Sequence, residues 1–184
     1  MSGIKSGREE GVLGLRNIKE GVSSSGGGSS ILIASNVETV PLGVAYSQID
    51  TGTAIPHFTA INISNPGSFN KVGLNIRDHS VDGSVYVAVY DYQFNNLLQA
   101  TFWVTSNGVR YQNFNSDATL DLNAGLYYVG VLKRTGTFSF ACILGDGTKT
   151  DIAFQGTSGS DFTSPETTFN NSGRSLWAAL SNQV

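Results

Sequence analysis

Apolar and polar residues alternate in short runs from about residue 31 to the end of the 184-residue chain, a pattern typical of β-strands. Turn-forming pairs such as Asp82-Gly83 and Asn107-Gly108 separate the runs. No segment of helical length repeats apolar residues with the helical period. We therefore expect strands at residues 31–34, 43–49, 57–64, 71–77, 84–92, 97–105, 109–113, 118–122, 126–133, 137–144, 150–154 and 175–180.

This succession of strands predicts an all-β domain. Many short antiparallel strands in one domain favour an antiparallel β-sandwich, with a jelly roll as the expected topology. The strand at residues 84–92 is apolar on both faces, because valines alternate with aromatic residues and alanine: Val85, Val87 and Val89 against Tyr86, Ala88 and Tyr90. Either it is a central strand of its sheet, or one of its faces meets a partner subunit.

The N-terminal segment differs from this body in composition. Residues 1–20 hold seven charged side chains, and the frequent glycines oppose a long helix because each costs about 1 kcal/mol relative to alanine. Residues 23–30, SSSGGGSS, have the composition of a flexible linker. We expect an extended anchoring arm at residues 1–21, a linker at 22–30 and the β-sandwich domain at 31–184. The candidate anchor residues are the apolar residues of the arm: Ile4, Val12, Leu13, Leu15 and Ile18.

Charge and cysteine usage argue against several classes of protein. The net charge is −3 and no basic stripe is present, so we expect no binding of nucleic acid. No stretch reaches the roughly 18 apolar residues of a membrane span, and the N-terminus lacks the apolar centre of a signal peptide. The single cysteine, Cys142, lies in an apolar run and is expected to be a buried thiol. A fold without disulfides is typical of a reducing cytosol.

Residues with catalytic or metal-binding chemistry are sparse. The chain has two histidines, His57 and His79, and neither a Gly-x-Ser-x-Gly nor a His-Glu-x-x-His motif. We expect His57 at a strand edge and His79 in a polar loop. The aspartates of residues 78–83 and 146–151 are interpreted as turn formers, because neither segment matches a calcium loop of the EF-hand type. The sequence therefore predicts a protein that is not an enzyme and that needs no metal or cofactor.

Carbohydrate binding is the one ligand chemistry that the sequence keeps open. Four aromatic residues are candidates for stacking on sugars if they are exposed: Trp103, Tyr111, Phe114 and Trp177. Trp103 lies within the expected strand at residues 97–105, which favours a place in the core. Trp177 lies in the run SLWAAL near the C-terminus, where it is a candidate for a subunit interface.

The segment from Val85 to Leu144 resembles a β-sandwich domain found in virion proteins of tailed bacteriophages, such as head fibres, decoration proteins and tail-fibre tips. The resemblance rests on a strand that ends in Tyr-Asp, a following Leu-Leu strand and a later Leu-x-Leu-x-x-Gly-x-Tyr-Tyr corner. In this chain the corner is formed by Leu120, Leu122, Gly125, Tyr127 and Tyr128. The resemblance covers about a third of the chain, and other jelly-roll modules use a similar corner.

The resemblance implies a non-enzymatic structural protein of the virion, made in the host cytoplasm. Its N-terminal arm would attach to the capsid or to another virion protein, and its β-sandwich would project as a head fibre or decorate the capsid. A homotrimer is a further implication. One alternative is the receptor- or glycan-binding tip of a tail fibre, which would contact a host surface glycan. Another is a secreted carbohydrate-binding domain of an enzyme.

Overall fold

The computed structural model describes residues 36–40, 43, 47–144, 153–156, 162, 169–171 and 173–182. The expected arm and linker, and the expected strand at residues 31–34, lie outside the described residues. The described residues form strands, one short 3₁₀ turn (Asn115–Asp117) and no α-helix. The strands are β1 (Asn36–Glu38), β2 (Ser47–Ile49), β3 (His57–Ile63), β4 (Gly67–Phe69), β5 (Lys71–Val81), β6 (Gly83–Tyr90), β7 (Asn96–Val104), β8 (Gly108–Asn113), β9 (Leu120–Leu122), β10 (Gly125–Lys133), β11 (Thr137–Leu144), β12 (Ala153–Gly156), β13 (Phe169–Asn171), β14 (Arg174–Leu176) and β15 (Ala178–Ser181).

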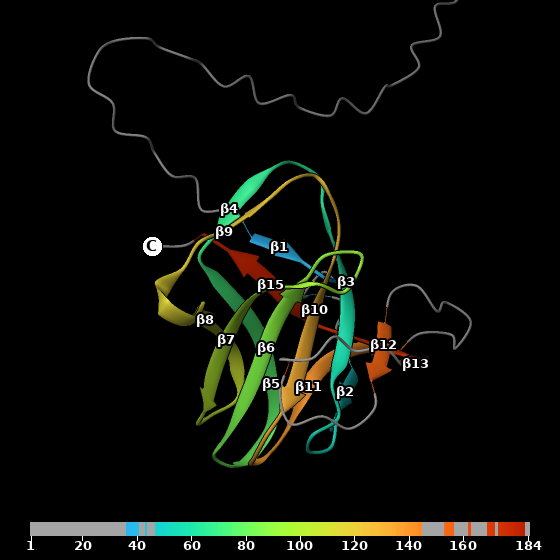
Figure 1. Ribbon diagram of the computed structural model, residues 1–184. Helices are drawn as coiled ribbons and strands as arrows, with labels where there is room; N and C mark the ends of the chain where they lie inside the picture. Colours follow the sequence, from blue (N-terminus) through green and yellow to red (C-terminus); the bar gives the residue numbers. More distant parts are fainter. Residues whose placement is uncertain are drawn as a thin grey trace, which may run out of the picture. The chain divides into compact units, whose positions relative to one another are not determined.

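Eight of these strands form a jelly roll (Figure 1). In sheet A the neighbouring order is β2-β11-β5-β8, and in sheet B it is β3-β10-β6-β7. The chain passes between the sheets at the β5–β6, β7–β8 and β10–β11 connections, as the two Greek keys of a jelly roll require. All pairs are antiparallel, so the predicted antiparallel β-sandwich and its jelly-roll topology are confirmed.

Further strands extend both sheets. In sheet A, β15 pairs with β5 on one side and β1 on the other, and β14 pairs with the end of β11. In sheet B, β12 pairs with β3, and β13 pairs with β12. A separate two-stranded ribbon, β4 with β9, lies at one end of the sandwich.

The core lies between the two sheets and follows the predicted alternation. Val85, Val87 and Val89 of β6 point inward, where they pack in one cluster with residues of sheet A such as Leu74 and Phe140. β6 pairs with β10 on one side and β7 on the other. It is therefore a central strand, which was the first of the two alternatives predicted for residues 84–92. Leu176 N donates a hydrogen bond of 3.0 Å to Thr59 Oγ1 and links the two sheets through buried polar atoms.

The outer face of sheet B is aromatic, and the chain itself covers much of it. Phe94, in the β6–β7 turn, stacks on Tyr128 of β10 with ring centroids 4.6 Å apart. Phe162 packs edge-on against Phe58 of β3 and Tyr90 of β6. The second apolar face of β6 therefore meets other segments of the same chain along this part of the sheet, which explains why the sequence is apolar on both sides.

The β6–β7 turn is organised by one carboxylate. Asp91 Oδ1 accepts hydrogen bonds of 2.9 Å from the backbone N–H groups of Gln93 and Asn95, and its Oδ2 accepts one of 2.8 Å from the Asn95 side chain. This Asx-type turn places Phe94 at a φ of 61°. The Tyr90-Asp91 pair at the end of β6 thus has a local structural role, because Asp91 directs Phe94 back over sheet B.

The Leu-x-Leu-x-x-Gly-x-Tyr-Tyr corner is also a structural feature. Leu120 and Leu122 of β9 are buried, and Gly125 begins β10. Tyr128 is buried on the outer face of sheet B, and its neighbour Val129 enters the core between the sheets. We conclude that the corner passes the chain from the β4–β9 ribbon into a central strand.

The two ends of the sandwich are built differently. The hairpin end carries the β2–β3, β5–β6, β7–β8 and β10–β11 connections, and the ribbon end carries the β4–β9 ribbon and the β6–β7 turn. At the hairpin end two connections touch, because a Cβ added to Gly83 would lie 2.1 Å from the carbonyl oxygen of Thr135. Asn36 lies at the ribbon end, since Ser181 pairs both with Asn36 and with Lys71, the first residue of β5.

Candidate functional site

The four aromatic residues proposed for sugar stacking occupy different environments, and one of them, Phe114, is 1% exposed. Trp103 of β7 is 68% exposed on the outer face of sheet B, so the expectation that it belongs to the core is wrong. Trp177 is 1% exposed, and its Nε1 donates a hydrogen bond of 3.2 Å to Glu38 Oε2. The Tyr111 ring fills the space that a side chain at Gly73 would need. Trp177 and Phe114 are thus buried, Tyr111 is partly exposed with its ring against Gly73, and Trp103 is the most exposed of these side chains.

The neighbours of Trp103 form what we call the Trp103 face, which consists of Ser84, Tyr86, Thr101, Trp103 and Arg134. Trp103 is directly opposite Ser84, and Thr101 is opposite Tyr86. Arg134 joins from the adjacent strand end, where its N–H donates a hydrogen bond of 2.9 Å to the Ser84 carbonyl oxygen. The face therefore spans the ends of three neighbouring strands of sheet B, a width of roughly 10 Å.

Polar groups on this face are held in place by local contacts. The Arg134 guanidinium carbon lies 5.2 Å from the centroid of the Tyr86 ring, a cation–π geometry. Ser84 Oγ lies 3.2 Å from Thr135 Oγ1, and Ser84 N donates a hydrogen bond of 3.0 Å to the same hydroxyl. Hydroxyls, an aromatic pair and one guanidinium thus surround an exposed indole.

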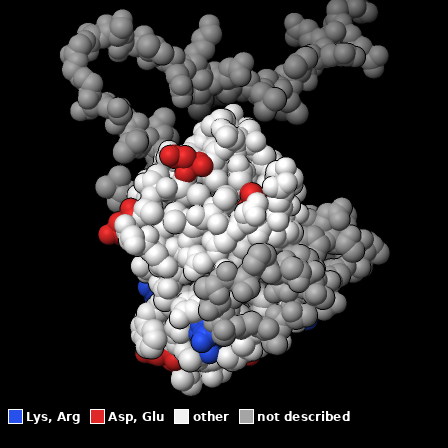
Figure 2. All heavy atoms as spheres, in the orientation of Figure 1, with Lys and Arg blue, Asp and Glu red and all other residues white. Residues whose placement is uncertain are grey.

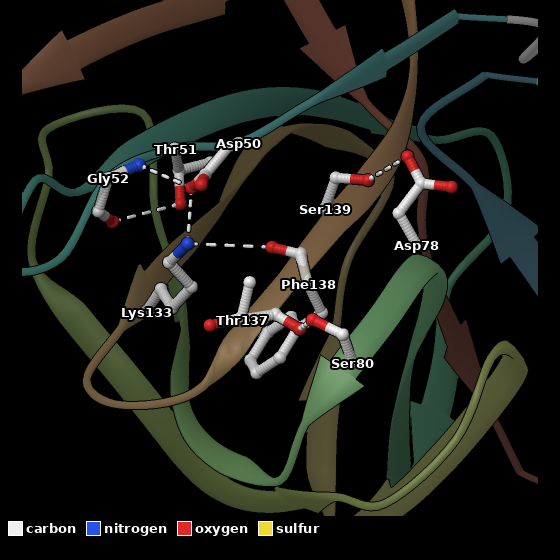
Figure 3. A network of polar contacts seen from close by, with 9 residues as sticks. All are labelled: Asp50, Thr51, Gly52, Asp78, Ser80, Lys133, Thr137, Phe138 and Ser139. Atoms are coloured by element: carbon white, nitrogen blue, oxygen red, sulfur yellow. Dashed lines mark hydrogen bonds and ion pairs between the residues drawn. The ribbon is translucent and has the colours of Figure 1, made fainter.

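A polar network stiffens the interior at the same hairpin end (Figure 3). Lys133 is 3% exposed; its ammonium pairs with Asp50 and lies 3.4 Å from the Phe138 carbonyl oxygen. The hydrogen bond from Lys133 lowers the pKa of the Asp50 carboxyl. Gly52 N donates a further hydrogen bond of 2.9 Å to Asp50 Oδ1. The network fastens the β2–β3 connection to β10 and β11.

His57 also lies in the interior, which corrects the expectation of a strand-edge residue. It begins β3 between β10 and β12, opposite Val131 and Gln155, and it is 3% exposed. Burial, together with the charge of Arg174, lowers the pKa of His57 to about 4, although a backbone hydrogen bond at Thr51 acts in the opposite direction. Its Nδ1 has no hydrogen-bond partner among the described residues. The ring is therefore neutral at physiological pH.

Other candidate residues do not assemble into a reactive site. His79 Nε2 lies 3.0 Å from Asp82 Oδ1 at the hairpin end. Cys142 is buried as predicted, and burial raises the pKa of its thiol. Within the described part of the chain, no three His, Cys, Asp or Glu residues lie close enough together to hold a metal ion. Residues 146–151 lie outside the described residues.

A shallow hollow of about 380 Å³ lies at the ribbon end, next to the corner of β9 and β10. Its lining includes Ser68, Asp121 and Asn123. The Ser68 hydroxyl donates a hydrogen bond to the Asp121 carboxylate, so the two strongest polar groups of the hollow are bonded to each other. The Trp103 face is therefore the better candidate for a ligand surface.

Trp103 was predictable from the sequence as an aromatic candidate, and its four neighbours on this face were not predicted. Tyr86 was interpreted only as part of an apolar strand face, and Arg134 was not singled out. The available signal was the period-two pattern of β7, in which Trp103 alternates with Phe102 and Val104. Both of those residues are buried, which places the indole on the opposite face.

The proposed anchor residues Ile4, Val12, Leu13, Leu15 and Ile18 lie outside the described residues. Over the residues that can be described, no helix is long and apolar enough to cross a membrane. No protein-family model, curated protein or solved structure matches the chain.

Proposed function

We propose that this protein is a non-enzymatic structural component of a bacteriophage virion, a head fibre or capsid decoration, attached by its N-terminal arm. The observation that carries the proposal is the jelly roll with its β9–β10 corner, because that corner is the motif on which the resemblance to phage proteins rests. Its residues serve packing: Leu120, Leu122 and Tyr128 are all buried.

The composition of the arm supports attachment through the N-terminus. Residues 1–21 combine charges with scattered apolar residues, and a Gly/Ser-rich stretch separates them from the body. The first described residue, Asn36, enters the sandwich at the ribbon end. A particle bound to the arm would then be connected to the ribbon end, and the hairpin end would be free to project. Assembly into a homotrimer stays a prediction from the resemblance.

A second candidate function is a receptor- or glycan-binding tip domain of a tail fibre. The specific observation in its favour is the exposed indole of Trp103 at the hairpin end. The part of this side of the molecule that grey atoms leave visible in Figure 2 carries few charged groups, which suits an uncharged ligand better than nucleic acid. Both candidate functions are compatible with the same β-sandwich. They differ in whether its hairpin end binds a receptor or glycan.

Deletion of residues 1–21 tests the proposed attachment. We expect the shortened chain to fold and stay soluble, because the described strands all begin after residue 35. In cells infected with the phage that encodes the protein, the full chain should co-sediment with purified particles, and the shortened chain should remain in the supernatant. Circular dichroism of the shortened chain provides the control for folding.

Two results would contradict the proposal. One is that the shortened chain occupies particles as fully as the intact chain does. The arm would then not be needed for attachment. The other is an intact chain that is absent from purified particles by mass spectrometry, which would remove the virion assignment itself.

A further inference from the structure

We infer that the Trp103 face is a carbohydrate-binding surface, which takes pyranose rings of a bacterial surface polysaccharide by stacking them on the Trp103 indole. The inference deepens the second proposed function and depends on it for its biological setting. Its physical basis is the hairpin end of sheet B alone, so it can be tested on the purified protein.

The first observation in favour of sugar binding is the exposure of Trp103. An indole that is 68% exposed on the outermost strand of a sheet keeps a large apolar ring in water, while its neighbours Phe102 and Val104 are buried. The remainder of the same outer face is aromatic as well, but Phe94 and Phe162 cover it. Trp103 thus lies on the uncovered part of an aromatic sheet face.

The polar groups around the indole indicate which class of ligand would bind there. Ligand sites combine aromatic surface with a few convergent polar groups. Here the groups are the hydroxyls of Ser84 and Thr101 and the guanidinium of Arg134, and all three lie on strand ends next to Trp103. A pyranose offers C–H groups for the ring and hydroxyls for these donors and acceptors. Protein interfaces also favour Trp, Tyr and Arg, so a protein partner is the alternative that the experiment below must separate from a sugar.

The setting of the face is rigid, which favours binding. The polar network of Lys133 and Asp50 and the close contact between Gly83 and Thr135 fix the connections next to it. Arg134 is held over Tyr86, so less freedom is lost when a ligand is bound. The face also lies at the opposite end of β5 from Asn36, roughly 30 Å away along the strand. A chain attached through its N-terminus would present this surface outward.

The test uses the full-length protein on an array of bacterial surface oligosaccharides from capsules and O-chains, followed by titration of each sugar that binds. We expect at least one pyranose-containing oligosaccharide to bind, and Trp103→Ala to weaken that affinity tenfold or more. Trp103→Phe should keep part of the affinity, since a smaller ring still stacks. Tyr92→Ala is the matched control, because Tyr92 is also 68% exposed but lies in the β6–β7 turn at the ribbon end.

Analytical ultracentrifugation of the wild type and Trp103→Ala separates sugar binding from self-association. The inference predicts the same oligomeric state for both. It is overturned if Trp103→Ala dissociates an oligomer, if Trp103→Ala binds the sugar as tightly as the wild type, or if nothing on the array binds. The array experiment measures sugar binding by the purified chain and does not depend on attachment to particles. A failure of the sugar-binding inference can therefore be distinguished from a failure of the proposed attachment.

Discussion

Replacement of Trp177 by alanine is expected to lower the free energy of unfolding by about 3–5 kcal/mol. The indole is fully buried on the outer side of sheet A, where it packs with Val40, Ala141 and Ala179. The substitution leaves a large cavity and removes the hydrogen bond from Nε1 to Glu38. Urea denaturation followed by circular dichroism measures the change.

Trp103→Ala is the matched control for this experiment, because it removes the other tryptophan of the chain. Trp103 is mostly exposed, so its loss should change the free energy of unfolding by no more than about 0.5 kcal/mol. If the two variants were destabilised equally, the assignment of one indole to the interior and the other to the surface would be wrong. That result would also remove the basis of the sugar-binding inference.

Acidification from pH 6.5 to pH 4 is expected to destabilise the protein through His57 by about 3 kcal/mol in total. The pKa of His57 falls from its ordinary value of 6.5 to about 4 on folding. Between these values the unfolded chain binds a proton that the folded chain does not, so the free energy of unfolding decreases as the pH falls. About one pH unit above 6.5 and about one below 4, the slope contributed by this histidine disappears.

The His57→Gln variant isolates the effect, because glutamine stays uncharged at every pH in this range. Its free energy of unfolding should fall less steeply than that of the wild type between pH 6.5 and pH 4. Denaturant titrations of both proteins at a series of pH values measure the difference. Parallel profiles for wild type and variant would show that His57 is accessible to protons in the folded protein.

Much of the fold was predictable from local sequence patterns. Strands such as β3, β10 and β11 begin or end within a residue of their predicted bounds, because alternation and turn pairs specify them locally. The three-residue strands β1, β4 and β13 were missed. Segments this short carry no periodic signal, and they become strands only because a long partner strand supplies their hydrogen bonds.

The candidate site was less predictable, because its character depends on which face of a sheet is covered. Trp103 and Trp177 both occur in apolar runs, yet one is exposed and the other is buried. The difference arises from distant residues: Val40 packs over the Trp177 side of sheet A. Likewise the buried Lys133 pairs with the exposed Asp50, which lies 83 positions away in the chain. Sequence spacing has no local signal for such pairs.

If the proposed arm binds the particle and the Trp103 face binds sugar, the two ends of the sandwich have different partners. Asn36, the first described residue, lies at the ribbon end, and Trp103 lies at the hairpin end. A protein of this kind would need no catalytic residue. Its specificity would depend on a few exposed side chains held by a rigid jelly roll.

The most direct test of this account is a cryo-electron microscopy map of the virion at a resolution that shows strands. The account predicts the jelly roll on the particle surface with its ribbon end, which carries β4 and β9, toward the particle. It also predicts that the β5–β6 and β7–β8 connections and Trp103 face outward. A map with the hairpin end buried against the particle, or with no density for this protein, would contradict the account.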